Sequence, residues 1–133
     1  MKKGFTFVEL LAVIIILVVI ALITTPIIVN IIETSRKGTA TTSTLGYIRA
    51  VEKYYLDNLG SNKALETGTD LEVTGLNGKF KTTGQLPTDG TLRIDEDGLV
   101  EKATLCVGNY YISYDGADAV IEKGKTCQDL KQS

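Results

Sequence analysis

The sequence predicts an α+β fold, in which one long N-terminal helix packs its second half on a small antiparallel sheet. Residues 10–23 are an unbroken apolar run. After this run, apolar residues recur three or four positions apart as far as Leu59, which is typical of a helix with one buried face. From residue 91 onward, short apolar runs alternate with turn dipeptides, which is the pattern of antiparallel strands.

The apolar run is long enough to cross a membrane. Between Phe5 and Val29 the only charged residue is Glu9, and about 20 apolar residues in a helix span a hydrocarbon core. No small-residue cleavage site follows the run, so we expect it to be retained rather than removed as a secretory signal. Two basic residues on each side leave its orientation undecided by charge.

The sequence after the apolar run predicts the amphipathic second half of the helix. Its apolar positions are Leu45, Ile48, Val51, Tyr55 and Leu59, and the other positions carry Arg49, Glu52, Lys53 and Asp57. We expect a single helix from about Phe5 to Leu59, roughly 80 Å long. Pro26 should kink it, because the proline ring clashes with the carbonyl four residues earlier and its nitrogen has no hydrogen to donate.

Residues 60–90 are polar and rich in glycine and threonine, which indicates a connecting loop with a short hairpin around Asn77-Gly78. The runs TLRID, LVEKATLCV, YYISYD and AVIEK follow and predict an antiparallel meander. A sheet of this size needs a cover on one face, and the amphipathic helix is the candidate.

The composition argues against two classes of function. The chain has 14 basic and 16 acidic residues, so nucleic-acid binding has no electrostatic support. Because there is no histidine, neither a Ser-His or Cys-His nucleophile nor a His-ligated metal can be built. We therefore predict no enzyme, no cofactor and no metal site. The acidic stretch Asp95 to Gly98 lacks EF-hand spacing and is explained as a turn.

Cys106 and Cys127 are the two cysteines of the chain. An even pair behind an export or anchor segment favours one disulfide, and two free or buried thiols are the alternative.

At the N-terminus, a glycine and a phenylalanine are followed four residues later by a glutamate at the start of the apolar run. This arrangement resembles the processing and assembly signature of type IV prepilins and related pseudopilins. The resemblance is carried by Lys3, Gly4, Phe5, Thr6, Glu9, Leu10 and Leu11, with support from Pro26. It is close over roughly the first thirty residues; beyond them the likeness is architectural and includes the C-terminal cysteine pair.

The resemblance implies a fold of the type IV pilin kind and a division of the chain into three parts. Residues 1–4 would be a leader, and residues 5–32 a transmembrane and filament-core helix. Residues 33–133 would be an extracellular head, made of the amphipathic helix half (33–59), the loop (60–90), and the meander with the disulfide region (91–133).

The resemblance also implies a life cycle and partners. Prepilin peptidase would cleave after Gly4, and the new amine of Phe5 would be N-methylated. The subunit would wait in the cell membrane with its head outside. An inner-membrane platform with an ATPase would then move it into a helical homopolymer at the cell surface, where it contacts itself and other pilins. In that filament Glu9 would pair with the amine of a neighbouring subunit, and a disulfide would bound a variable C-terminal region.

The chemistry of Glu9 agrees with this expectation, because a carboxylate in an apolar core is tolerable when it is paired. The alternative is a carboxylate near enough to the headgroups to stay wet. One departure from the family is Val18 and Val19, where many members have a glycine before the proline.

The expected function is a structural pilus subunit that serves adhesion, motility or surface interaction. The alternatives are a pseudopilin of a type II secretion or DNA-uptake machine and, from another class, a monomeric membrane-anchored extracellular binding module.

Overall fold

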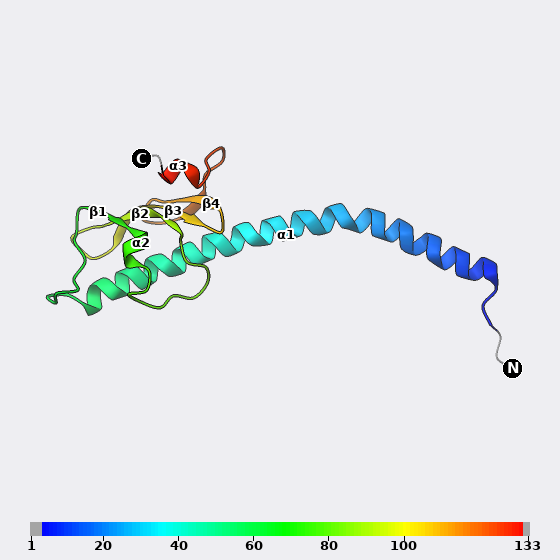
Figure 1. The fold of residues 1–133 in the computed structure, drawn as a ribbon, viewed down its shortest axis with the longest axis horizontal. Helices are drawn as coiled ribbons and strands as arrows, with labels where there is room; N and C mark the ends of the chain where they lie inside the picture. The colour runs from blue at the N-terminus through cyan, green and yellow to red at the C-terminus, as the bar shows by residue number, and fades with distance from the viewer. Residues whose placement is uncertain (1–3, 132–133) are drawn as a thin grey trace. The chain divides into compact units, whose positions relative to one another are not determined.

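The computed structural model describes residues 4–131 (Figure 1), so Lys2 and Lys3 of the expected leader lie outside the described residues. In chain order the described elements are α1 (Phe7–Asp57), β1 (Asp70–Glu72), α2 (Val73–Leu76), β2 (Asp89–Ile94), β3 (Val100–Val107), β4 (Tyr110–Tyr114), β5 (Ala119–Ile121) and α3 (Gln128–Lys131).

The long helix predicted from the sequence is present. α1 has 51 residues and runs without a break through Pro26. The chain divides into two compact units within this helix, between Ser35 and Arg36. The first unit consists of the apolar part of α1 and the residues before it, and the second contains the rest of α1 together with the sheet.

The sheet has five antiparallel strands in the order β1-β2-β3-β4-β5, each paired with its neighbour in sequence. Every one of the four apolar runs that predicted the meander contains a strand. One face of the sheet is apolar, because Leu92 pairs with Ala103, which in turn pairs with Tyr114.

The core lies between this face and the part of α1 that belongs to the second unit. The largest side chains buried there come from the helix and from three strands: Tyr47, Ile48, Val51, Leu92, Ile94, Leu105 and Ile112. Three buried polar side chains also lie on the helix face, namely Ser43, Thr44 and Glu52. Thr44 Oγ1 donates to the Ala40 carbonyl (2.9 Å), and Ser43 Oγ accepts the N–H of Gln85 (3.0 Å). They are tolerated because each is hydrogen-bonded.

The buried face of α1 is the predicted one in most positions: Ile48 and Val51 are buried, and Leu45 and Tyr55 pack against the core. Three residues differ from the prediction. Leu59 lies beyond the helix and is 57% exposed, whereas Tyr47 is fully buried. Glu52, which the pattern assigned to the polar side, is buried and accepts the N–H of Val100 (3.2 Å). Hydropathy spacing misassigned Glu52 because its carboxylate finds a hydrogen-bond partner 48 residues away in the sequence.

The prediction of a hairpin at Asn77-Gly78 is wrong, and residues 60–90 are not all loop. β1 pairs with β2, and the single-turn helix α2 follows β1 directly. Val73 and Leu76 of α2 are buried in the core. Asn77 lies after α2, where its side-chain amide donates to the Pro87 carbonyl (2.9 Å). The segment that forms β1 and α2 has few apolar residues, so its own sequence does not predict these elements. They form because β1 pairs with β2 and because Val73 and Leu76 are buried in the core.

Candidate functional site

The start of α1 brings together three residues that the sequence singled out: Gly4, Phe5 and Glu9. Gly4 and Phe5 precede the helix, and Glu9 lies in its first turn. All three are exposed, Phe5 to 85%, and a Cβ atom added at Gly4 would meet nothing within 4 Å. The peptide bond between Gly4 and Phe5 is therefore open to another protein.

Thr6 and Glu9 form a capping box at this end of the helix. The Glu9 N–H donates to Thr6 Oγ1 (3.2 Å), and the Thr6 N–H donates to Glu9 Oε2 (3.3 Å). The first turn of a helix leaves its amides unpaired, and this reciprocal arrangement satisfies two of them. The carboxylate also lies at the positive end of the helix dipole. Glu9 thus has a partner within its own chain.

The sequence contains a local pattern that predicts this cap, in addition to the unusual charge of Glu9 in an apolar run. A threonine three residues before a glutamate, directly before an apolar run, is the pattern of a capping box. The cap engages Oε2, and a carboxylate has several lone pairs. A second donor can therefore bind Glu9 while the helix stays capped.

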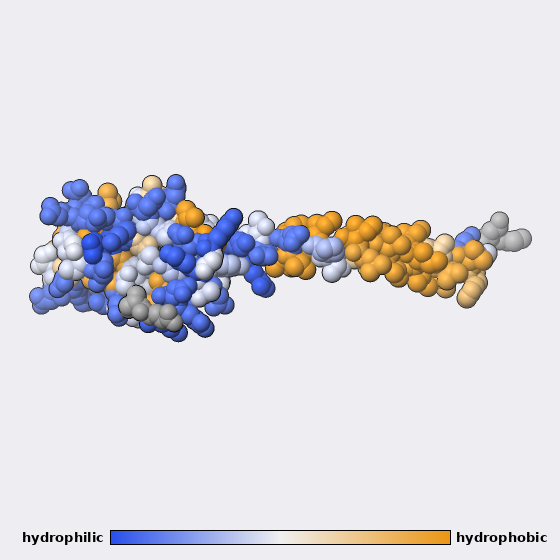
Figure 2. Space-filling view, turned by 90° about the horizontal axis from the view of Figure 1, so that it is seen from above, coloured by the Kyte–Doolittle hydropathy of each residue, from blue (hydrophilic) through white to orange (hydrophobic). Residues whose placement is uncertain are grey.

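The first part of α1 is apolar on every side. Its large side chains are exposed from Phe7 to Ile32, and Figure 2 shows a mostly hydrophobic surface along this stretch, interrupted by a few paler and bluish atoms. Among the described residues, α1 is the one helix long and apolar enough to cross a membrane. A surface of this kind is covered in a cell by lipid or by other apolar surfaces.

Pro26 lies within this apolar stretch, next to two threonines whose hydroxyls are satisfied by the helix. Thr24 Oγ1 donates to the Ile20 carbonyl (3.0 Å), and Thr25 Oγ1 donates to the Ala21 carbonyl (2.7 Å). Such bonds hide a hydroxyl from an apolar medium. The kink at Pro26 stays a prediction.

Cys106 and Cys127 form the predicted disulfide, in the second unit and away from the start of α1 in sequence. It attaches the C-terminal segment to β3. Two further contacts hold the segment on the same sheet: Lys131 lies 3.8 Å from Asp89, and the Lys125 amine lies 5.2 Å from the centre of the Tyr111 ring.

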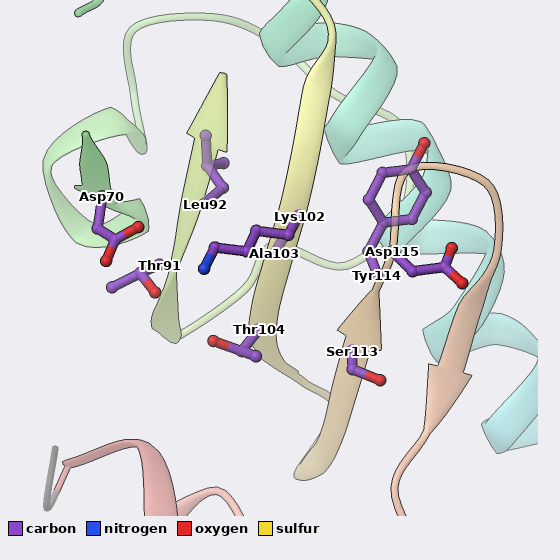
Figure 3. A pocket seen from close by; sticks show the side chains of 9 residues that line it. All are labelled: Asp70, Thr91, Leu92, Lys102, Ala103, Thr104, Ser113, Tyr114 and Asp115. Atoms are coloured by element: carbon purple, nitrogen blue, oxygen red, sulfur yellow. The ribbon is translucent and has the colours of Figure 1, made fainter. Parts of the chain in front are cut away.

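A hollow of about 340 Å³ lies on the polar face of the sheet (Figure 3), lined by Asp70, Thr91, Leu92, Lys102, Ala103, Thr104, Ser113, Tyr114 and Asp115. Its carboxylates are already engaged. Asp70 pairs with Arg93 (2.9 Å). The amides of Asp118 and Ala117 donate to Asp115 and hold the pKa of its carboxyl below the usual range. The hollow therefore presents no free pair of acid and base groups.

No group of three or more His, Cys, Asp or Glu side chains that could hold a metal ion occurs within residues 4–131. The turn at Asp95 is held by its own side chain, whose Oδ1 accepts the amides of Asp97 and Leu99 (2.9 Å each). Its carboxylate thus has a structural role.

Comparisons of the chain with protein-family models, with curated proteins and with solved structures found no match.

Proposed function

We propose that this chain is a structural subunit of a type IV pilus or pilus-like filament. Prepilin peptidase would cleave it after Gly4, and it would polymerise through the apolar part of α1. The observation that carries the proposal is the arrangement at the start of α1. An exposed Gly4–Phe5 bond lies four residues before an exposed carboxylate, which stands at the head of a helix that is apolar on every side.

The exposed apolar surface of α1 is compatible with two successive environments, first a membrane and then a bundle of similar helices. Each large apolar side chain that leaves water contributes about 1.5–3 kcal/mol, so the segment is stable in a membrane before assembly. Transfer from lipid to a bundle of similar helices brings no comparable gain, because lipid tails are as apolar as leucine. Polar contacts must then help to decide which helices associate and in which register.

Glu9 can supply such a contact. Cleavage after Gly4 would create a positive amine on Phe5, and a carboxylate enclosed by apolar helices is tolerable when a cation pairs with it. The capping box leaves lone pairs of Glu9 for the amine of a neighbouring subunit. The resemblance adds the other partners: the peptidase, an assembly platform with its ATPase, and other pilins.

The same chemistry would serve a pilus or the pseudopilus of a secretion or DNA-uptake machine. A monomeric, membrane-anchored binding module is the second candidate, and the hollow on the polar sheet face favours it. In that case the apolar part of α1 would be only an anchor, and the charge of Glu9 would be dispensable.

The decisive experiment compares Glu9→Gln with Glu9→Ala in cells that assemble the wild-type protein. Glutamine keeps the capping hydrogen bond but cannot form an ion pair, whereas alanine removes both. We expect both variants to lose filaments at least about tenfold, measured by shearing and quantitative immunoblotting, while their heads stay folded.

Mass spectrometry of each variant provides the control, since the mature chain should begin at Phe5 with one added methyl group. Wild-type filament yield from Glu9→Gln would show that capping suffices and would refute the ion pair. Wild-type yield from both variants would favour the anchored module, and an intact Met1 in mature wild-type protein would refute processing.

A further inference from the structure

The apolar part of α1 has few side chains that can form hydrogen bonds. From Phe7 to Ile32 they are Glu9, Thr24, Thr25 and Asn30. Glu9 is engaged by the capping box, and the two threonines bond to carbonyls one turn earlier. Three of the four are therefore satisfied within the chain.

Asn30 is the exception. Its side-chain amide has no hydrogen-bond partner among residues 4–131. It lies in a shallow hollow on one side of α1, lined by Ile27, Asn30, Ile31, Thr34 and Ser35. An amide that is enclosed by apolar helices without a partner loses several kcal/mol, so any contact that covers this surface must provide for Asn30.

The same stretch contains an acceptor without its usual donor. In an α-helix the carbonyl of Leu22 would receive the N–H of residue 26, but that residue is Pro26, which has no N–H. The neighbouring threonine hydroxyls donate to Ile20 and Ala21. Leu22 therefore offers a main-chain carbonyl on a surface that is otherwise apolar.

We propose that Asn30 of one copy donates its side-chain amide to the Leu22 carbonyl of a second, parallel copy of this chain. The pair would set the register of the helices. Leu22 and Asn30 lie eight positions apart, so neighbouring copies would be offset by about 12 Å along the helix axis. This inference rests on the proposed function and specifies how its subunits contact one another.

The occupant is a second copy because one chain carries both halves of the pair on the same helix. Eight positions apart on one helix, the two groups cannot reach each other, but across two helices they can. Such a contact joins different residues on the two copies and shifts them along the axis, so it generates an open filament rather than a closed dimer. One polar residue in an apolar helix seam is also a known way to specify register.

The test is disulfide cross-linking between two differently tagged full-length copies, with Ile15→Cys in one and Ile23→Cys in the other. These positions lie two turns before Leu22 and Asn30, on the same helix faces, and have the same offset of eight. Copies that both carry Ile23→Cys report the alternative, unshifted register. Membranes and sheared filaments are oxidised with copper phenanthroline, and dimers are quantified by non-reducing electrophoresis.

We expect the 15–23 cross-link to exceed the 23–23 cross-link in the wild-type background. Asn30→Leu removes the donor, and Pro26→Ala restores an N–H that occupies the Leu22 carbonyl. Each change should lower the ratio of the two cross-links about threefold to tenfold, as expected for a hydrogen bond between membrane helices. The double variant should show no further fall.

Thr25→Val is the matched control, because it removes a hydroxyl that is already bonded to Ala21; it should leave the ratio unchanged. The proposal is overturned if neither Asn30→Leu nor Pro26→Ala changes the ratio of the 15–23 to the 23–23 cross-link. It is also overturned if the 23–23 cross-link dominates in the wild type. If wild-type filaments form but the ratio does not change in these variants, the proposed register is wrong and the proposed function is not affected. Absence of wild-type filaments would instead count against the proposed function.

Discussion

Glu9 and Glu52 both lie where hydropathy alone would not place a carboxylate: Glu9 at the start of an apolar run and Glu52 on the buried side of α1. Each accepts a main-chain hydrogen bond. Glu9 caps the start of α1 through the Thr6 N–H. Glu52 is 8% exposed and accepts the Val100 N–H at the start of β3, with the Arg49 guanidinium 3.5 Å away. A hydrogen bond from an amide lowers the penalty of burying or shielding a carboxylate. At the residue scale, the role of each glutamate follows from the amide it meets.

Glu52→Ala should destabilise the head by about 1–3 kcal/mol, because it leaves the buried Val100 amide without an acceptor. Glu52→Gln should lose less, since its side-chain oxygen can still accept that hydrogen bond. Lys53→Ala, on the exposed side of α1, should change stability by no more than about 0.5 kcal/mol. Urea unfolding monitored by circular dichroism measures all three. Equal stability of Glu52→Ala and Lys53→Ala would contradict the role given to Glu52.

At the scale of elements, the C-terminal segment is the stretch of the second unit (the head) that contains Cys127 and α3. Its position depends most on the disulfide. α3 has no buried residue. The ion pair of Lys131 with Asp89 is largely exposed, and such pairs contribute about 0–1 kcal/mol. The contact of Lys125 with Tyr111 is of similar size at an exposed site. The covalent bond between Cys106 and Cys127 therefore holds the segment on the sheet.

Replacing both cysteines by alanine should lower the free energy of unfolding by about 3 kcal/mol, from loop-closure entropy over a sequence separation of 21. The sheet should persist, because its core residues do not belong to the segment. Limited trypsin digestion should then cut after Lys123 and Lys125 first, and mass spectrometry identifies the fragments. Wild-type protein that is reduced and alkylated should behave like the double variant. A trypsin pattern equal to that of the oxidised wild type would show that the weak contacts suffice.

At the scale of the whole molecule, the two units have opposite relations to their surroundings. The second unit encloses its apolar side chains between α1 and the sheet. Within its described residues, 4–35, the first unit exposes all of its large apolar side chains, and lipid or other apolar surfaces are needed to cover them. The core of the second unit and the exposed apolar surface of the first thus belong to separate parts of the chain.

A fragment of residues 36–133 should therefore fold by itself as a soluble monomer. Its thermal midpoint should lie within a few degrees of that of the head in detergent-solubilised full-length protein, because no residue of the core cluster precedes Ala40. Size-exclusion chromatography and circular dichroism measure both properties. Aggregation of the fragment, or a cooperative transition much lower than in the full chain, would show that the apolar part of α1 contributes to the stability of the head.

The sequence by itself determined the elements that rest on local pattern. An apolar run followed by spacings of three and four predicts the long helix, and apolar runs between turn dipeptides predict β2 to β5, because side-chain periodicity is a property of neighbouring residues. The cap at Thr6 and Glu9 also depends only on neighbouring residues, so the sequence predicts it from the spacing of three. The spacing also predicted most of the buried side of α1, since Ile48, Val51 and their neighbours lie on the core. Tertiary structure alone decided that β1 and α2 form within an apparent loop and that Glu52 faces the core. Each of these depends on a distant partner: Glu52 meets an amide 48 residues away, and β1 forms by pairing with β2. Periodicity carries no information about such partners, and folding supplies them.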